Sequence, residues 1–193
     1  MEATAATIDA LLRAGVGIKV DDVLRMVGDL VDETTLARPS ILSIALAPLL
    51  RVAPDADLTA TLVRALLGCR VPINGVPLWP EKRLHRDQPL LTPSVFHTAQ
   101  ALTVLRTAPE ELVGDDVAAA ERWIADAEDL NGTTEIIRRD LDADHREDLA
   151  FHRFTSTWVV RALAGAAVPD RRRIEHALDY VWSRYDPALH LWA

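Results

Sequence analysis

Several residue types are scarce in this chain, and each scarcity excludes a class of protein. Cys69 is the only cysteine, so an internal disulfide framework is excluded, and the composition fits a reducing compartment. No run of about 18 apolar residues occurs, and no charged segment leads into an apolar one at the N-terminus. We therefore expect a cytoplasmic protein with neither a signal peptide nor a membrane span.

Lysine is almost missing as well, because Lys19 and Lys82 are the only two and arginine supplies the remaining positive charge. This bias, together with abundant alanine, is typical of a GC-rich bacterial genome. Lysine plus arginine number 21 against 29 aspartates and glutamates, which gives a net charge of −8. Such a chain repels a phosphate backbone, and its one basic cluster, Arg171 to Arg173, is flanked by acids. We expect no nucleic-acid partner.

Hydrophobic residues make up 49% of the 193 residues, enough for one domain with a real core. Apolar residues recur at helical spacing along the whole chain, first around Ile8 and then from Val20 to Val31. No stretch of alternating apolar and polar residues is long enough to predict a sheet. The pattern therefore predicts an all-α protein.

One helix pattern returns three times, in 39–47, 93–102 and 154–163, with Ala47, Ala101 and Ala162 at the matching position. Each copy opens on a hydroxyl residue suited to cap a helix, and a second helix follows after a proline and an acid. Such self-similarity predicts stacked two-helix units. We expect an N-terminal helical segment over 1–37 and repeats over 38–92, 93–152 and 153–193. The caps are Ser40, Ser94 and Ser156, and the helix pairs are 40–51 with 58–68, 94–106 with 115–128, and 155–165 with 171–184.

These repeats resemble a known family. Ser94 to Leu102 matches the pattern Ser-x-x-x-Thr-Ala-x-Ala-Leu, Asn74 to Pro80 resembles a Gly-x-Trp loop, and His152 to Leu163 resembles a helix entry of squalene-cyclase-like proteins. Together they resemble the α/α-toroid repeats of terpenoid cyclases and protein prenyltransferases. The resemblance implies inner helices paired with outer helices, and three pairs would form half of a toroid. Either the chain forms an open arc or a second chain completes the ring. An arc exposes an apolar terminal face, so we expect a homo- or hetero-oligomer.

Clustered carboxylates give the clearest candidate for chemistry, at Asp140, Asp142 and Asp144. Neighbouring carboxylates raise one another's pKa, and a proton held in this way can serve as a general acid. The resembled class II cyclases use an Asp-x-Asp-Asp motif to protonate an isoprenoid, whereas the spacing here is Asp-x-Asp-x-Asp. The alternative interpretation is a solvated acidic loop balanced by neighbouring arginines.

The residues beside the predicted inner helices are candidates for a ligand-facing wall, namely Phe96, His97, Phe154 and Trp158. Aromatic faces of this kind stabilise carbocations in cyclases, but packing in a core is the favoured interpretation of the same residues. We expect His97 on the concave side of its helix. Trp123 and Trp182 have core-like spacing, whereas Trp79 and Trp192 are expected to hold loops. We assign no metal site and no cofactor, because no paired ligand spacing is present.

Two functions remain open from the sequence. The first is a non-catalytic or accessory toroid-type module that binds a partner chain or an apolar ligand, such as an isoprenoid, in its concave face. The second is a class II isoprenoid cyclase that uses Asp140, Asp142 and Asp144 as the acid.

Overall fold

Helices dominate the structure, a computed structural model, which confirms the all-α prediction. It describes residues 2–80, 94–113, 115–126, 134–140, 146–152, 155–166, 169–183, 185–188 and 191–192. The helices are α1 (Glu2–Arg13), α2 (Val20–Gly28), α3 (Glu33–Leu36), α4 (Pro39–Val52), α5 (Asp57–Gly68), α6 (Val95–Leu105), α7 (Glu110–Val113), α8 (Asp116–Asp126), α9 (Thr155–Ala164) and α10 (Arg171–Ser183).

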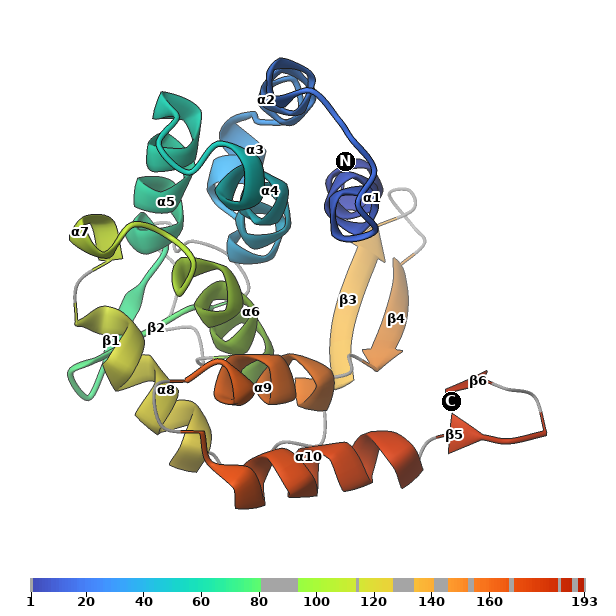
Figure 1. Ribbon diagram of the computed structural model, residues 1–193. Helices are drawn as coiled ribbons and strands as arrows, with labels where there is room; N and C mark the ends of the chain where they lie inside the picture. The colour runs from blue at the N-terminus through green and yellow to red at the C-terminus, as the bar shows by residue number, and fades with distance from the viewer. Residues whose placement is uncertain are drawn as a thin grey trace.

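The helices lie in two rows (Figure 1). In the inner row α1 packs on α4, α4 on α6, and α6 on α9, while α5, α8 and α10 pack outside α4, α6 and α9 respectively. The three helix pairs expected from the sequence are therefore present. Helix α1 adds to the inner row, although the sequence pattern had separated residues 1–37 from the repeats.

Helix ends follow local chemistry. Gly15 stops α1 because it takes a φ of +79°, which residues with a side chain rarely adopt. The predicted cap at Ser94 is confirmed, since its hydroxyl accepts a hydrogen bond from the backbone N–H of His97. The predicted cap at Ser40 is wrong. Helix α4 begins one residue earlier, at Pro39, whose fixed φ suits the first helical position.

The expectation of no sheet is also wrong in detail, because the described residues form three antiparallel two-stranded hairpins, two between helices and one after α10. In the first, Asn74 and Gly75 form a tight turn, and both have positive φ, which is the requirement of a type I′ hairpin turn. Asn-Gly is the strongest short-range hairpin signal, but only three residues flank it on each side, too few to alternate visibly. The strands are β1 (Val71–Ile73) with β2 (Val76–Leu78), β3 (Thr134–Asp140) with β4 (Arg146–His152), and β5 (Tyr185–Asp186) with β6 (Leu191–Trp192).

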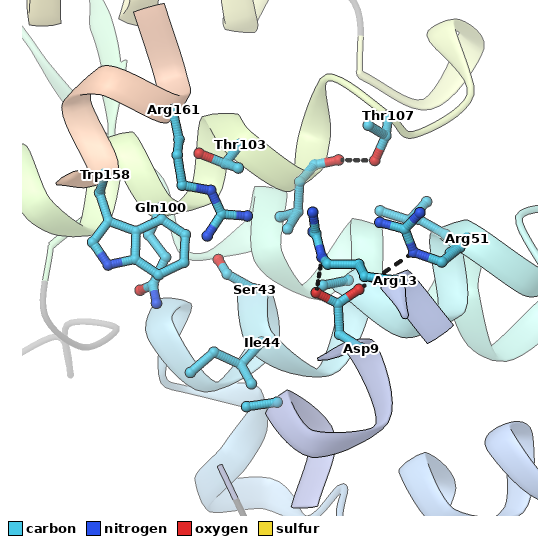
Figure 2. Close-up of a pocket in the computed structure, with 14 residues that line it drawn as sticks. Asp9, Arg13, Ser43, Ile44, Arg51, Gln100, Thr103, Thr107, Trp158 and Arg161 are labelled. Atoms are coloured by element: carbon cyan, nitrogen blue, oxygen red, sulfur yellow. Dashed lines mark hydrogen bonds and ion pairs between the residues drawn. The ribbon is translucent and has the colours of Figure 1, made fainter. Parts of the chain in front are cut away.

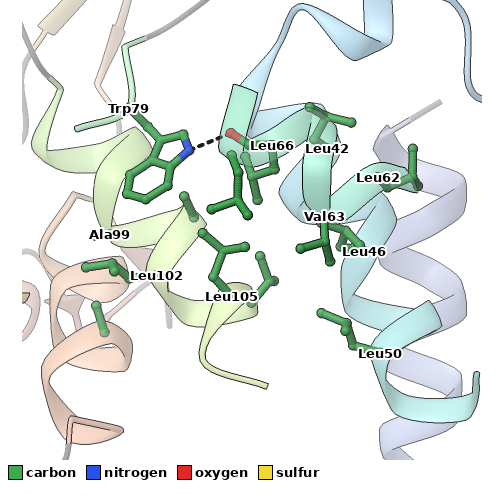
Figure 3. Packing of buried hydrophobic residues seen from close by; sticks show 14 of the residues in the cluster. Leu42, Leu46, Leu50, Leu62, Val63, Leu66, Trp79, Ala99, Leu102 and Leu105 are labelled. Carbon is green, nitrogen blue, oxygen red and sulfur yellow. Dashed lines mark hydrogen bonds between the residues drawn. The ribbon is translucent and has the colours of Figure 1, made fainter. Parts of the chain in front are cut away.

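The hydrophobic core fills the space between the two rows (Figure 3). Leu42 and Leu46 of α4 meet Leu62 and Leu66 of α5, and each of these side chains is fully buried. Complete burial of one such leucine contributes about 2 kcal/mol relative to exposure. The inner row is therefore fixed from its outer side, which leaves its other side available for a site.

The tryptophans divide between core and surface. Trp79 holds the segment after the β1–β2 hairpin between two repeats, as expected, and its fully buried side chain is also part of the core. Trp123 packs against the core as predicted. Trp182 was also expected to pack, yet 60% of it is exposed, with an edge contact to Tyr185. Helix α10 is the last of the outer row, so its far face meets no further described helix.

Candidate functional site

A cavity of about 520 Å³ lies on the inner side of the helix row (Figure 2). Helices α1, α4, α6 and α9 each contribute residues spaced three or four apart, so that each helix presents one face to the cavity. Its lining combines apolar and polar side chains. These are Ala6, Asp9 and Arg13 from α1; Ser43, Ile44, Ala47, Leu50 and Arg51 from α4; Gln100, Thr103 and Val104 from α6, with Thr107 just after it; and Trp158 and Arg161 from α9.

Two of the three arginines share one carboxylate. The Nε of Arg13 donates to an oxygen of Asp9 over 2.7 Å, one helical turn away on α1. The Nε of Arg51 on α4 approaches the other oxygen of Asp9 at 3.5 Å. The Asp9 side chain is only 16% exposed, so the two guanidinium groups compensate a partly desolvated charge. This ion pair also joins α1 to the first repeat.

The third arginine, Arg161, has a different environment. Its Cζ lies 4.5 Å from the centre of the Trp158 ring, a cation–π contact one helical turn apart on α9. Within the described part of the chain it forms no ion pair with a carboxylate. The pKa of Arg161 is lowered, first because partial burial disfavours its charge and second because Arg13 repels it, while Asp9 acts in the opposite direction. Arginine nevertheless remains protonated at neutral pH.

The hydroxyl groups of the lining donate to their own helices. Ser43 donates to the carbonyl of Pro39, Thr103 to that of Ala99 and Thr107 to that of Val104, each over 2.8 Å. Because their protons are engaged, these oxygens can only accept hydrogen bonds from a molecule in the cavity. The guanidinium groups are therefore its charged donors.

Gln100 adds a buried amide oxygen that accepts no hydrogen bond from the described residues. Its side chain is 2% exposed, and the oxygen concerned is Oε1. A buried amide oxygen without a partner costs about 1–3 kcal/mol, and such groups in folded proteins call for an explanation. Gln100 also lines the cavity, so its Oε1 is an acceptor that a bound molecule could use.

The structure brings only part of the predicted aromatic wall to this cavity. Trp158 lines it, and its ring meets the edge of Phe96 at a centroid distance of 6.2 Å. Phe96 in turn meets His97 at 5.0 Å, and both are buried in the helix packing rather than among the described lining residues. Ser94 accounts for part of the position of His97, since its Oγ lies 2.8 Å from the His97 Nδ1. Phe154 lies outside the described residues.

Of the three predicted acids, only Asp140 falls within the described residues. Asp140 is the last residue of β3 and stands opposite Arg146 of β4 in the hairpin register. Asp142 and Asp144 lie outside the described residues. Over the part of the chain that the structure describes, no three His, Cys, Asp or Glu side chains are grouped to hold a metal ion. None of the helices described there is long and apolar enough to cross a bilayer.

Sequence reasoning missed the charged residues of the cavity. Asp9 and Arg13 are four apart on α1, and that spacing was the available signal for an ion pair. Their convergence with Arg51 and Arg161 depends on how α1, α4 and α9 pack, which no local pattern specifies. Comparisons with protein-family models, with curated proteins and with solved structures found no match to this chain.

Proposed function

We propose that this chain is a ligand-binding module of the α/α-toroid type, which holds the apolar body of a small molecule in the cavity on its inner helix row. The observation that carries the proposal is the cavity itself. Its volume of about 520 Å³ lies within the range of about 300–1,000 Å³ that is typical of small-molecule sites. Its apolar wall includes Trp158, Ile44 and Val104, and such walls supply most of the binding energy in these sites.

Two further features support a toroid-type module. Inner helices pack on one another while outer helices cover their backs, which is the arrangement that the resemblance implies. A ligand that binds in the concave face of such a module would lie among these inner helices. Four helices contribute to one cavity of small-molecule size, which favours a ligand over a partner chain.

The alternative, a class II isoprenoid cyclase, stays a prediction. Its acid depends on Asp142 and Asp144, and no observation on the described residues favours it. Association with a second copy or another chain likewise stays a prediction, and light scattering of the purified protein would measure it.

The proposal is tested with N-phenyl-1-naphthylamine, a neutral probe whose fluorescence rises in apolar sites. We expect saturable binding at one site per chain. Ala47→Trp should abolish it, because Ala47 lines the cavity from α4 and an indole there would fill the space. Ala6→Phe, at an exposed lining position on α1, should weaken it.

Ala118→Trp is the matched control, because Ala118 is exposed on α8 and is not among the cavity residues. It should leave binding unchanged, and thermal unfolding should show that all variants fold. Absence of saturable binding, or binding that survives both cavity-filling variants, would contradict the proposed function.

A further inference from the structure

Among the described residues, the charges around the cavity do not balance. Arg13, Arg51 and Arg161 line it together with one described carboxylate, that of Asp9, which Arg13 and Arg51 already share. The whole chain is acidic, with a net charge of −8, so a local excess of positive charge runs against its composition. A cavity lined by one sign of charge concentrates ligands of the opposite sign.

Arg161 has N–H donors that no described carboxylate accepts. Its guanidinium offers five N–H donors, yet among the described residues it has no carboxylate partner and rests on the face of Trp158. Figure 2 shows the Arg161 and Arg13 guanidinium groups directed toward the same part of the cavity, from α9 and α1 respectively. Two guanidinium groups brought together in this way repel each other, and an anion placed between them removes the repulsion.

Charged and apolar groups lie next to each other in the wall of the cavity. The ring of Trp158 presents apolar surface immediately beside Arg161, and Ile44 continues that surface on α4. A ligand with an anionic end and an apolar body would therefore satisfy both kinds of wall at once. A wholly apolar ligand would leave the excess guanidinium charge partly desolvated and uncompensated, which costs free energy.

We propose that the ligand is an amphipathic organic anion whose oxyacid group, a carboxylate or a phosphate, is anchored by Arg161 together with Arg13, while its apolar body lies against Trp158. This inference rests on the proposed function and adds the chemical class of the ligand. Guanidinium groups match both oxyacids because two parallel N–H groups can donate to two oxygens.

The experiment is competition against bound N-phenyl-1-naphthylamine with octanoate, octyl phosphate, octan-1-ol and inorganic phosphate, all below their micellar range. We expect at least one of the two amphipathic anions to displace the probe at about tenfold lower concentration than octanol, as one charge-assisted hydrogen bond allows. Whichever anion is stronger identifies the oxyacid. Inorganic phosphate should not displace the probe, because it lacks the apolar body.

Arg161→Gln tests the anchor. It should bring the amphipathic anions to within about twofold of octanol measured on the same variant, and Arg161→Lys should retain part of the preference because the charge remains. Arg122→Gln is the matched control, since Arg122 is exposed on α8 and does not line the cavity. It should leave unchanged the concentration at which each competitor displaces the probe.

The outcomes separate the two claims. Failure of the neutral probe to bind overturns the proposed function and this inference with it. Saturable probe binding with equal competition by octanol and both anions overturns this inference alone. An anion preference that persists in Arg161→Gln also overturns it, because a group other than Arg161 would then bind the oxyacid.

Discussion

The indole Nε1 of Trp79 donates a 2.8 Å hydrogen bond to the backbone carbonyl of Leu66, in the last turn of α5. The backbone of Trp79 also exchanges hydrogen bonds with the side chain of Thr98 on α6. One residue that follows the β1–β2 hairpin thus connects the outer helix of the first repeat to the inner helix of the second.

Trp79→Phe tests that connection. We expect it to lower the free energy of unfolding by about 1–3 kcal/mol, because the indole hydrogen bond is lost and the smaller ring leaves a void. Urea denaturation followed by circular dichroism would measure the change. Trp182→Phe is the control at an exposed tryptophan, and it should change the value by less than about 0.5 kcal/mol. Equal effects at both positions would refute the role assigned to Trp79.

Gly165 is predicted to resist substitution because of a neighbouring side chain. A Cβ at this position would collide with the guanidinium of Arg106, which is held by an ion pair to Glu121 of α8. We expect Gly165→Ala to destabilise the protein by about 1 kcal/mol. Gly68→Ala should instead be neutral or stabilising by up to about 1 kcal/mol, since nothing lies within 4 Å of its Cβ position at the end of α5.

A double-mutant cycle identifies the cause at Gly165. Glu121→Gln weakens the ion pair and lets Arg106 move, so Gly165→Ala should cost less in that background. Additive effects of the two substitutions would show that the collision with Arg106 is not the origin of the destabilisation.

Two serines that the sequence treats alike should respond differently to alanine. Ser94→Ala should cost about 1–2 kcal/mol, because it removes the acceptor for the His97 backbone N–H at the start of α6. Ser40→Ala should cost nothing measurable, since Ser40 lies inside the first turn of α4 and does not cap it. Thermal unfolding would measure the stability of the two variants. A larger loss of stability in Ser40→Ala than in Ser94→Ala would contradict the assigned start of α4.

Arg161→Gln should stabilise the protein only slightly, with a rise in Tm of at most about 1 °C, because Arg161 is exposed and solvent screens most of the penalty on its charge. The lowered pKa of Arg161, caused first by burial and then by Arg13, means that the folded state disfavours its charge. Below the folded-state pKa the group is protonated in both folded and unfolded chains, so this penalty is constant. The Tm difference between variant and wild type should therefore be the same between about pH 6 and pH 9. A difference that changes sign in that range would contradict the explanation.

The sequence predicted those features that depend on neighbours along the chain. Helical periodicity and the cap at Ser94 each act within one or two helical turns, which is why the helix pairs were found close to their true bounds. The same local reasoning failed at Ser40, where Pro39 took the first helical position. It also failed at the β1–β2 hairpin, because strands of three residues carry too little alternation to be recognised.

By itself, then, the sequence determined the all-α class and the repeated helix pairs, because hydrophobic spacing requires each helix to bury one face. Only the tertiary structure decided what the inner row encloses. Asp9, Arg51 and Arg161 are far apart in the chain, and they meet at one cavity because α1 packs on α4, α4 on α6, and α6 on α9. The burial of Trp79 between α5 and α6 and the exposure of Trp182 on α10 were likewise decided by which elements pack around each side chain.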